Sequence, residues 1–161
     1  MAQFRCFGTV LFQFLLEGIM KNLFVILSIF VLFSAGCGKE EPPYEAANPI
    51  AFAYDLGDGW EVNSSVVVKG FKSNLVDNQY SSKLSFTLDM ISPTGDTLKE
   101  ITSGIRDHIS EEKPKDLSLE AQFELDSTYV GGKYKIIFHI KDEIALQPLV
   151  VEKEFELTDE D

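Results

Sequence analysis

Three carboxylates lie close together in the segment DLGDGWE: Asp55, Asp58 and Glu61. Calcium is held by about six to eight oxygen atoms gathered on a tight loop. The spacing of these residues misses the EF-hand pattern, and a glycine-containing turn between two strands explains the same composition. We therefore predict a solvated turn at this position and no metal site.

Two histidines are the candidates for acid–base catalysis. His108 follows Arg106 and Asp107 in an expected loop, and His139 falls on the polar face of an expected strand. A catalytic base needs a reacting partner within hydrogen-bond reach, and the sequence places no Ser, Cys or Glu in such a relation to either ring. We predict two surface histidines, no catalytic residue, no cofactor and no enzymatic activity.

Cys37 stands in a context that indicates a specific modification. Residues 20–36 have the layout of a secretory signal peptide: a basic start with Lys21, an apolar run over residues 23–33, and small residues before the cysteine. This stretch resembles the signal of bacterial lipoproteins, in which a peptidase cuts before the Cys. The resemblance implies a diacylglycerol thioether on the Cys37 sulfur and an acyl chain, such as palmitate, on its amine. Several acyl chains on one residue anchor a protein stably to a membrane.

Residues 1–19 precede a complete signal peptide, and we interpret them as an extension that starts upstream of the true initiator, Met20. If the extension is translated, residues 4–36 would instead form one long apolar segment, interrupted by Glu17 and Lys21, that serves as a membrane anchor. A third interpretation makes Cys37 an ordinary small residue of a buried helix or membrane span. The first two predict an exported protein tethered to a membrane.

A tether is predicted for residues 37–48. Its sequence after the cysteine, GKEEPPYEAAN, is charged, contains two prolines and shows no apolar period. Gly38 stands where an Asp would retain some lipoproteins in the inner membrane, so we expect the outer membrane. Residues 39–41, KEE, resemble the short acidic tags that send lipoproteins of Bacteroidota to the cell surface. A plain solvated linker explains them equally well, which leaves the periplasmic and cell-surface faces both open.

The length and charge of the chain exclude some classes of function. The chain has 161 residues, a formal charge of −12 and 45% apolar residues, which fits one folded domain after the tether. Because a surface with this much negative charge repels phosphate backbones, nucleic-acid binding is not expected. Cys6 lies in the extension and Cys37 would carry lipid, so no disulfide is predicted inside the fold.

The chain from residue 49 to residue 158 alternates apolar and polar residues with period two, which predicts strands. A turn is indicated at residues 93–96 and a charged loop at residues 110–116, and residues 159–161 form an acidic tail. The pattern predicts an all-β, antiparallel sandwich of about seven strands. The expected strands are residues 50–54, 62–71, 84–90, 97–102, 117–125, 133–141 and 149–157.

Tyr134 follows Gly131-Gly132-Lys133 at the start of an expected strand. The arrangement resembles that of immunoglobulin-like sandwiches, in which the ring of such a tyrosine covers the core and its hydroxyl bonds back to the preceding loop. The resemblance implies an immunoglobulin-like layout, although the chain lacks the Cys pair and its single Trp, Trp60, comes early. The alternative is that Tyr134 is an ordinary core residue of an alternating strand.

Four aromatic residues form a candidate platform for a sugar ring: Tyr54 and, as the principal ligand-binding candidates, Trp60, Phe71 and Tyr80. The alternative is that these side chains fill the core of a small sandwich, which is where such residues usually lie.

The order of several short segments is similar to that of the gliding-motility lipoproteins of Bacteroidota. They are Gly59-Trp60, residues 78–84, residues 93–98, and Gly132-Lys133-Tyr134 ahead of His139. The resemblance implies a lipid-anchored part of an envelope machine linked to secretion, and it transfers no functional residue. We expect a non-catalytic binding or assembly module at the outer membrane, whose partners are other envelope proteins. A gliding or secretion accessory protein and a glycan-binding surface lipoprotein are the alternatives.

Overall fold

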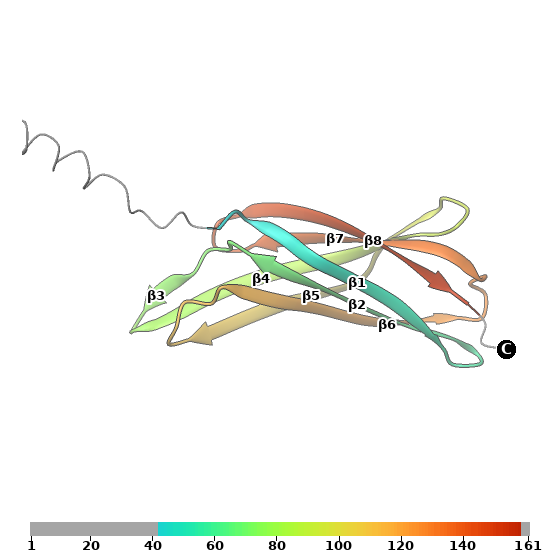
Figure 1. The fold of residues 1–161 in the computed structure, drawn as a ribbon, viewed down its shortest axis with the longest axis horizontal. Coiled ribbons are helices and arrows are strands. Elements are labelled where there is room, and N and C mark those ends of the chain that lie inside the picture. The colour runs from blue at the N-terminus through green and yellow to red at the C-terminus, as the bar shows by residue number, and fades with distance from the viewer. Residues whose placement is uncertain (1–41, 159–161) are drawn as a thin grey trace, which may run out of the picture. The chain divides into compact units, whose positions relative to one another are not determined.

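The computed structural model describes residues 42–158, and this part of the chain is built from antiparallel strands (Figure 1). Cys37, the signal peptide and residues 159–161 lie outside the described residues. The eight strands are β1 (Glu45–Asp55), β2 (Gly59–Lys69), β3 (Asn74–Val76), β4 (Gln79–Ile91), β5 (Thr97–Ser110), β6 (Asp116–Asp126), β7 (Gly132–Asp142) and β8 (Gln147–Leu157). Within residues 42–158, no helix is long and apolar enough to span a membrane.

The strands form two sheets. The first has the order β1-β2-β6, and the second has the order β3-β4-β7-β8 with β5 on the other side of β4. All pairings are antiparallel. The prediction of an all-β, antiparallel two-sheet fold is therefore confirmed, with one short strand, β3, more than the sequence suggested.

The core lies between the two sheets and is filled by alternate residues of the strands, because successive side chains of a strand point to opposite faces. Each large apolar side chain that is fully buried contributes roughly 1.5–3 kcal/mol. The fully buried members, at most 2% exposed, are Val62, Val66, Val68, Leu84, Leu88, Met90, Leu119, Tyr134, Ile136, Phe138, Ile140 and Leu157.

The domain begins earlier than predicted. Strand β1 starts at Glu45, and Tyr44 and Ala46 pack against the core. The prediction that the tether extends to residue 48 is therefore wrong. Ala46 and Ala47 pair with Val68 and Val67 of β2, and this ladder extends the strand through a segment whose sequence has no alternating pattern.

The predicted loop around His108 is also wrong, because β5 continues to Ser110. The segment is polar and contains Gly104, yet it pairs with β4 from Ser103 to Ser110. Strand propensity is overridden here by pairing with a long neighbouring strand. The loop at residues 111–115 and the turn at residues 93–96 lie where the sequence indicated them.

The hydroxyl of Tyr134 donates a hydrogen bond to the backbone oxygen of Val130, at 2.8 Å. The ring is buried, and this burial raises the pKa of the Tyr134 phenol above its usual value. The predicted bond from the start of this strand to the preceding loop is confirmed.

Candidate functional site

The predicted aromatic platform does not form at the surface. Trp60 and Phe71 are 7% and 6% exposed and belong to the core, while Tyr80 is half-buried. Trp60 occupies the same inward-facing series as Val62, and it lies opposite Leu125 of β6. The prediction that these residues bind a ligand is therefore wrong for Trp60 and Phe71, because both rings are buried in the core.

A different apolar row is exposed on the outer face of β1. Ile50, Phe52 and Tyr54 are 50%, 42% and 56% exposed, whereas the small residues between them, Ala51 and Ala53, pack against the core. The rings of Phe52 and Tyr54 contact each other edge to face, with 5.3 Å between their centroids. The large side chains thus face solvent and the small ones face inward, the reverse of the usual preference.

A bulge explains why this row points outward. The register between β1 and β2 shifts between Ala47 and Ile50, where Asn48 adopts a left-handed conformation with φ of 51°. One extra residue in a strand exchanges its two faces from that point on. Ala46 faces the core before the bulge, so uninterrupted alternation would have turned Ile50, Phe52 and Tyr54 inward as well.

Polar side chains lie beside the apolar row. Phe52 pairs with Asn63 of β2, and Asn63 pairs with Gln122 of β6. A shallow hollow of about 410 Å³ is lined by Phe52, Asn63, Ser64, Ser65, Glu120, Ala121 and Gln122. This face of the sheet therefore combines an aromatic wall with amide, hydroxyl and carboxylate groups that can donate and accept hydrogen bonds.

A second hollow, of about 390 Å³, separates β5 from β6. Each of these strands pairs on one side only, and no ladder joins them. Gly104 lies over the ring of Phe86, so closely that a Cβ at this position would come within 2.7 Å of ring carbons. The side chain of Arg106 lines the hollow and is exposed.

The residues considered for catalysis and metal binding lie apart. His139 is exposed on the outer face of the second sheet and contacts Asp89, with 3.0 Å between Nε2 and Oδ2. The backbone N–H of Glu100 and the His139 side chain hold the pKa of Asp89 below its usual value. Asp55 accepts a hydrogen bond from the backbone N–H of Gly57 in a tight turn. Across residues 42–158, no group of three or more His, Cys, Asp or Glu side chains is arranged to hold a metal ion.

Residues 42–44, which we call the docked segment, pack against one end of the sandwich. Gly70 has a φ of 68° and lies directly against Pro42 and Pro43: a Cβ at Gly70 would come within 2.2 Å of the Pro43 oxygen and 2.5 Å of the Pro42 oxygen. Only glycine combines this conformation with so close an approach. We refer to this end, with residues 70–73, the β3–β4 turn and the β7–β8 turn, as the tether end (Figure 1).

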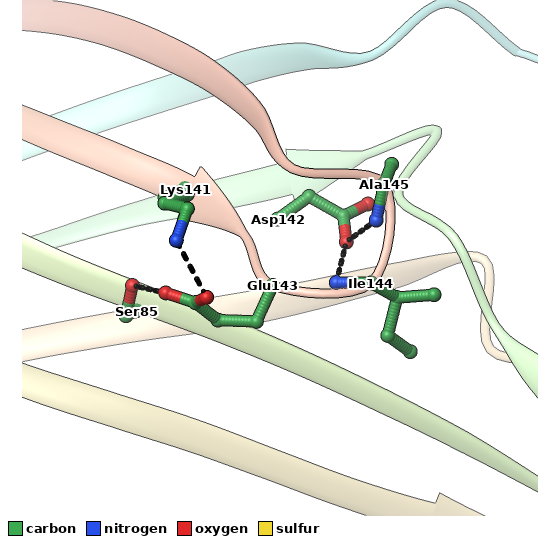
Figure 2. A network of polar contacts seen from close by, with 6 residues as sticks. All are labelled: Ser85, Lys141, Asp142, Glu143, Ile144 and Ala145. Atoms are coloured by element: carbon green, nitrogen blue, oxygen red, sulfur yellow. Dashed lines mark hydrogen bonds and ion pairs between the residues drawn. The ribbon is translucent and has the colours of Figure 1, made fainter.

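Asp142, 1% exposed, holds the tether end together. One carboxylate oxygen accepts hydrogen bonds from the backbone N–H groups of Ile144 and Ala145, both at 2.9 Å, as Figure 2 shows. The other oxygen accepts a bond from the backbone N–H of Lys72 at 2.6 Å. The charge of a buried carboxylate is stabilised by such donors, so Asp142 fixes the β7–β8 turn to the segment after β2.

The side chain of the next residue, Glu143, points away from that of Asp142 and toward Ser85 and Lys141 (Figure 2). Its carboxylate accepts hydrogen bonds from Ser85 at 2.5 Å and from Lys141 at 2.7 Å. The bonds from Lys141 and Ser85 lower the pKa of Glu143.

Tyr44, next to Pro43, lies close to the Asp142 carboxylate. Its hydroxyl oxygen is buried and has no hydrogen-bond partner. Burial, and next the negative charge of Asp142, raise the pKa of Tyr44 to about 12. The phenol therefore stays neutral, and the docked segment is held by packing and by the fit of the two prolines to Gly70.

Comparison of the chain with protein-family models and with curated protein sequences found no match. The functional conclusion therefore depends on the residues and geometry above.

Proposed function

We propose that this protein is a lipid-anchored module of the cell envelope that binds or assembles other envelope components at the outer membrane without catalysing a reaction. The sequence around Cys37 supports the anchor. The observation that carries the binding role is the outward row of Ile50, Phe52 and Tyr54, which a bulge turns away from a core that takes Ala51 and Ala53 instead.

The exposed row offers a useful amount of binding energy. Large apolar and aromatic side chains present about 150–250 Å² each, and about half of each remains exposed here. Covering the row would remove roughly 300 Å² of apolar surface from water, or about 7 kcal/mol at 25 cal/mol per Å². The loss of motional freedom on association offsets part of this gain. The remaining free energy, together with hydrogen bonds from the polar neighbours, is enough for specific binding.

The bond from Tyr134 to Val130 supports an immunoglobulin-like layout for the sandwich. Such a scaffold presents surfaces, while its function lies in the side chains placed on it. A gliding-motility or secretion subunit would be one specific form of the proposed module.

Glycan binding is the second candidate function, and the hollow beside Phe52 favours it. An aromatic wall can contact the apolar face of a sugar ring, and Asn63 and Gln122 can bond to its hydroxyls. The buried Trp60 and Phe71 play no part in this candidate site.

Two measurements test the proposed function. Cys37→Ala should move the protein from the membrane fraction to the soluble fraction, and mass spectrometry of the native protein should show lipid on Cys37. A Phe52→Ser/Tyr54→Ser variant should keep the anchor but migrate at lower apparent mass on native gels of solubilised envelopes, whereas a control Ile109→Ser on β5 should not. Continued membrane fractionation of Cys37→Ala would reject the anchor, and identical migration of all variants would reject the binding surface.

A further inference from the structure

We infer that the tether end faces the membrane and that the β3–β4 hairpin, residues 74–79, contacts the lipid surface with Leu75 and Val76. This inference rests on the proposed lipid anchor at Cys37. It adds an orientation of the domain and a second, non-covalent contact with the bilayer.

The short link between anchor and domain restricts the distance to the membrane. Four residues separate Cys37 from Pro42, and the backbone at Pro42 and Pro43 is already fixed against Gly70. A fully extended chain spans at most about 3.6 Å per residue. Pro42 therefore lies no more than about 18 Å from the Cα atom of Cys37, too near for the domain to turn its opposite end toward the bilayer.

The β3–β4 hairpin is suited to bridge this distance. It projects from the tether end (Figure 1), and Val76 is six residues beyond Gly70. At the same limit of about 3.6 Å per residue, Val76 lies at most about 22 Å from Gly70, close to the maximum span of the link between Cys37 and Pro42. The tip of the hairpin and the anchored cysteine can therefore lie at the same depth.

Strand β3, directly before the turn, is apolar on both faces, which a hairpin surrounded by water does not require. Leu75 and Val76 are adjacent in β3 and so point to opposite faces, yet they are 58% and 59% exposed. Leu146, in the β7–β8 turn of the same end, is 67% exposed. These side chains have no core to pack against, and a lipid surface can cover them without a protein partner.

The polar residues of the hairpin limit how deeply it enters. Asp77 and Asn78 form the turn in left-handed conformations, with φ of 49° and 63°, and β3 is held by its ladder to β4 and by a 2.7 Å bond between Ser73 and Ser82. A charged, rigid turn stays among the lipid headgroups while apolar side chains beside it reach the acyl boundary. The contact is thus interfacial.

Site-directed spin labelling of the lipidated protein tests this inference. Val76→Cys and, as a control at the opposite end, Leu56→Cys each introduce one labelling site, because the mature chain after Cys37 has no other cysteine. Both residues are exposed, so neither substitution disturbs the core. Each variant is reconstituted into vesicles of equal parts phosphatidylethanolamine and phosphatidylglycerol, and the accessibility of the nitroxide to oxygen and to a water-soluble nickel chelate is measured.

The label at residue 76 should show a several-fold higher ratio of oxygen to nickel accessibility than the label at residue 56. If both labels are equally accessible to nickel while the protein floats with the vesicles, the membrane-facing hairpin is refuted and the lipid anchor stands. If the protein does not float and mass spectrometry finds Cys37 unmodified, the anchor fails and the orientation fails with it.

Discussion

Removing the Asp142 carboxylate should destabilise the domain strongly, because three backbone N–H groups donate to it at 2.6–2.9 Å. A hydrogen bond to a charged group contributes about 1.5–3 kcal/mol. Water can reach the half-buried turn and replace part of what is lost, so we expect Asp142→Ala to lower the free energy of unfolding by about 3–4 kcal/mol. For a domain of this size that is a fall in Tm of roughly 10–20 °C.

Asp142→Asn separates geometry from charge. The amide keeps one oxygen for Ile144 and Ala145 but presents an NH₂ group, a donor, to the N–H of Lys72, so it should lose about 1–3 kcal/mol. Asp107→Ala is the matched control. Its carboxylate is 66% exposed and lies 3.4 Å from the Lys83 amine, and such surface pairs contribute about 0–1 kcal/mol.

Chemical denaturation followed by circular dichroism measures all three variants, and amide hydrogen exchange localises the effect. Exchange should accelerate first at Lys72, Ile144 and Ala145, the three donors to Asp142. The reasoning would be refuted if Asp142→Ala stayed within about 1 kcal/mol of Asp107→Ala, since a buried carboxylate with three donors would then contribute no more than a surface one.

Three further results are expected. The Tyr44 phenol has a pKa of about 12 in the folded chain and of about 10 in the unfolded chain. It should therefore contribute stability that is complete below pH 10 and is lost as the pH rises from 10 to 12. An alkaline absorbance titration of wild type and Tyr44→Phe measures the ionisation of this phenol. Gly70→Ala should displace Pro43, so limited proteolysis should cleave N-terminal to the domain at least tenfold faster. Tyr134→Phe loses the bond to Val130 and should cost about 1 kcal/mol in urea denaturation.

Strands β4 and β7 of the second sheet could be predicted from the sequence because the environment of their side chains repeats every two residues. Residues 84–90 alternate without interruption, and residues 134–140 do so except at Ile137; the inward-facing apolar residues of both series are buried. Alternation is reliable where one face of a sheet is dry and the other wet. The bond from Tyr134 to the preceding loop was predicted from a different local signal, the glycine pair before the tyrosine at the start of the strand.

Features that depend on contacts between distant residues were not readable. Asp142 ends an alternating strand and looks like any acidic turn residue, and its burial follows only from the meeting of the β7–β8 turn with Lys72, seventy residues away. His108 lies in a polar, glycine-containing stretch that becomes a strand because β4 pairs with it. Neither the donors nor the neighbouring strand can be inferred from the local sequence.

The β1 row shows how one residue decides between core and surface. The sequence PIAFAYD predicts a strand. Which of its side chains face the core depends on the alternation that starts at Ala46, and the bulge at Asn48 inserts one extra residue into that alternation. Asparagine is among the few residues that tolerate a left-handed conformation within a strand, so the signal is present but weak. The bulge interrupts pairing with β2 and leaves three large apolar side chains exposed, and these two observations are the reason for proposing a partner that covers the row. The proposed partner would cover the row in the bulged strand; without the extra residue, uninterrupted alternation from Ala46 would have turned the row toward the core.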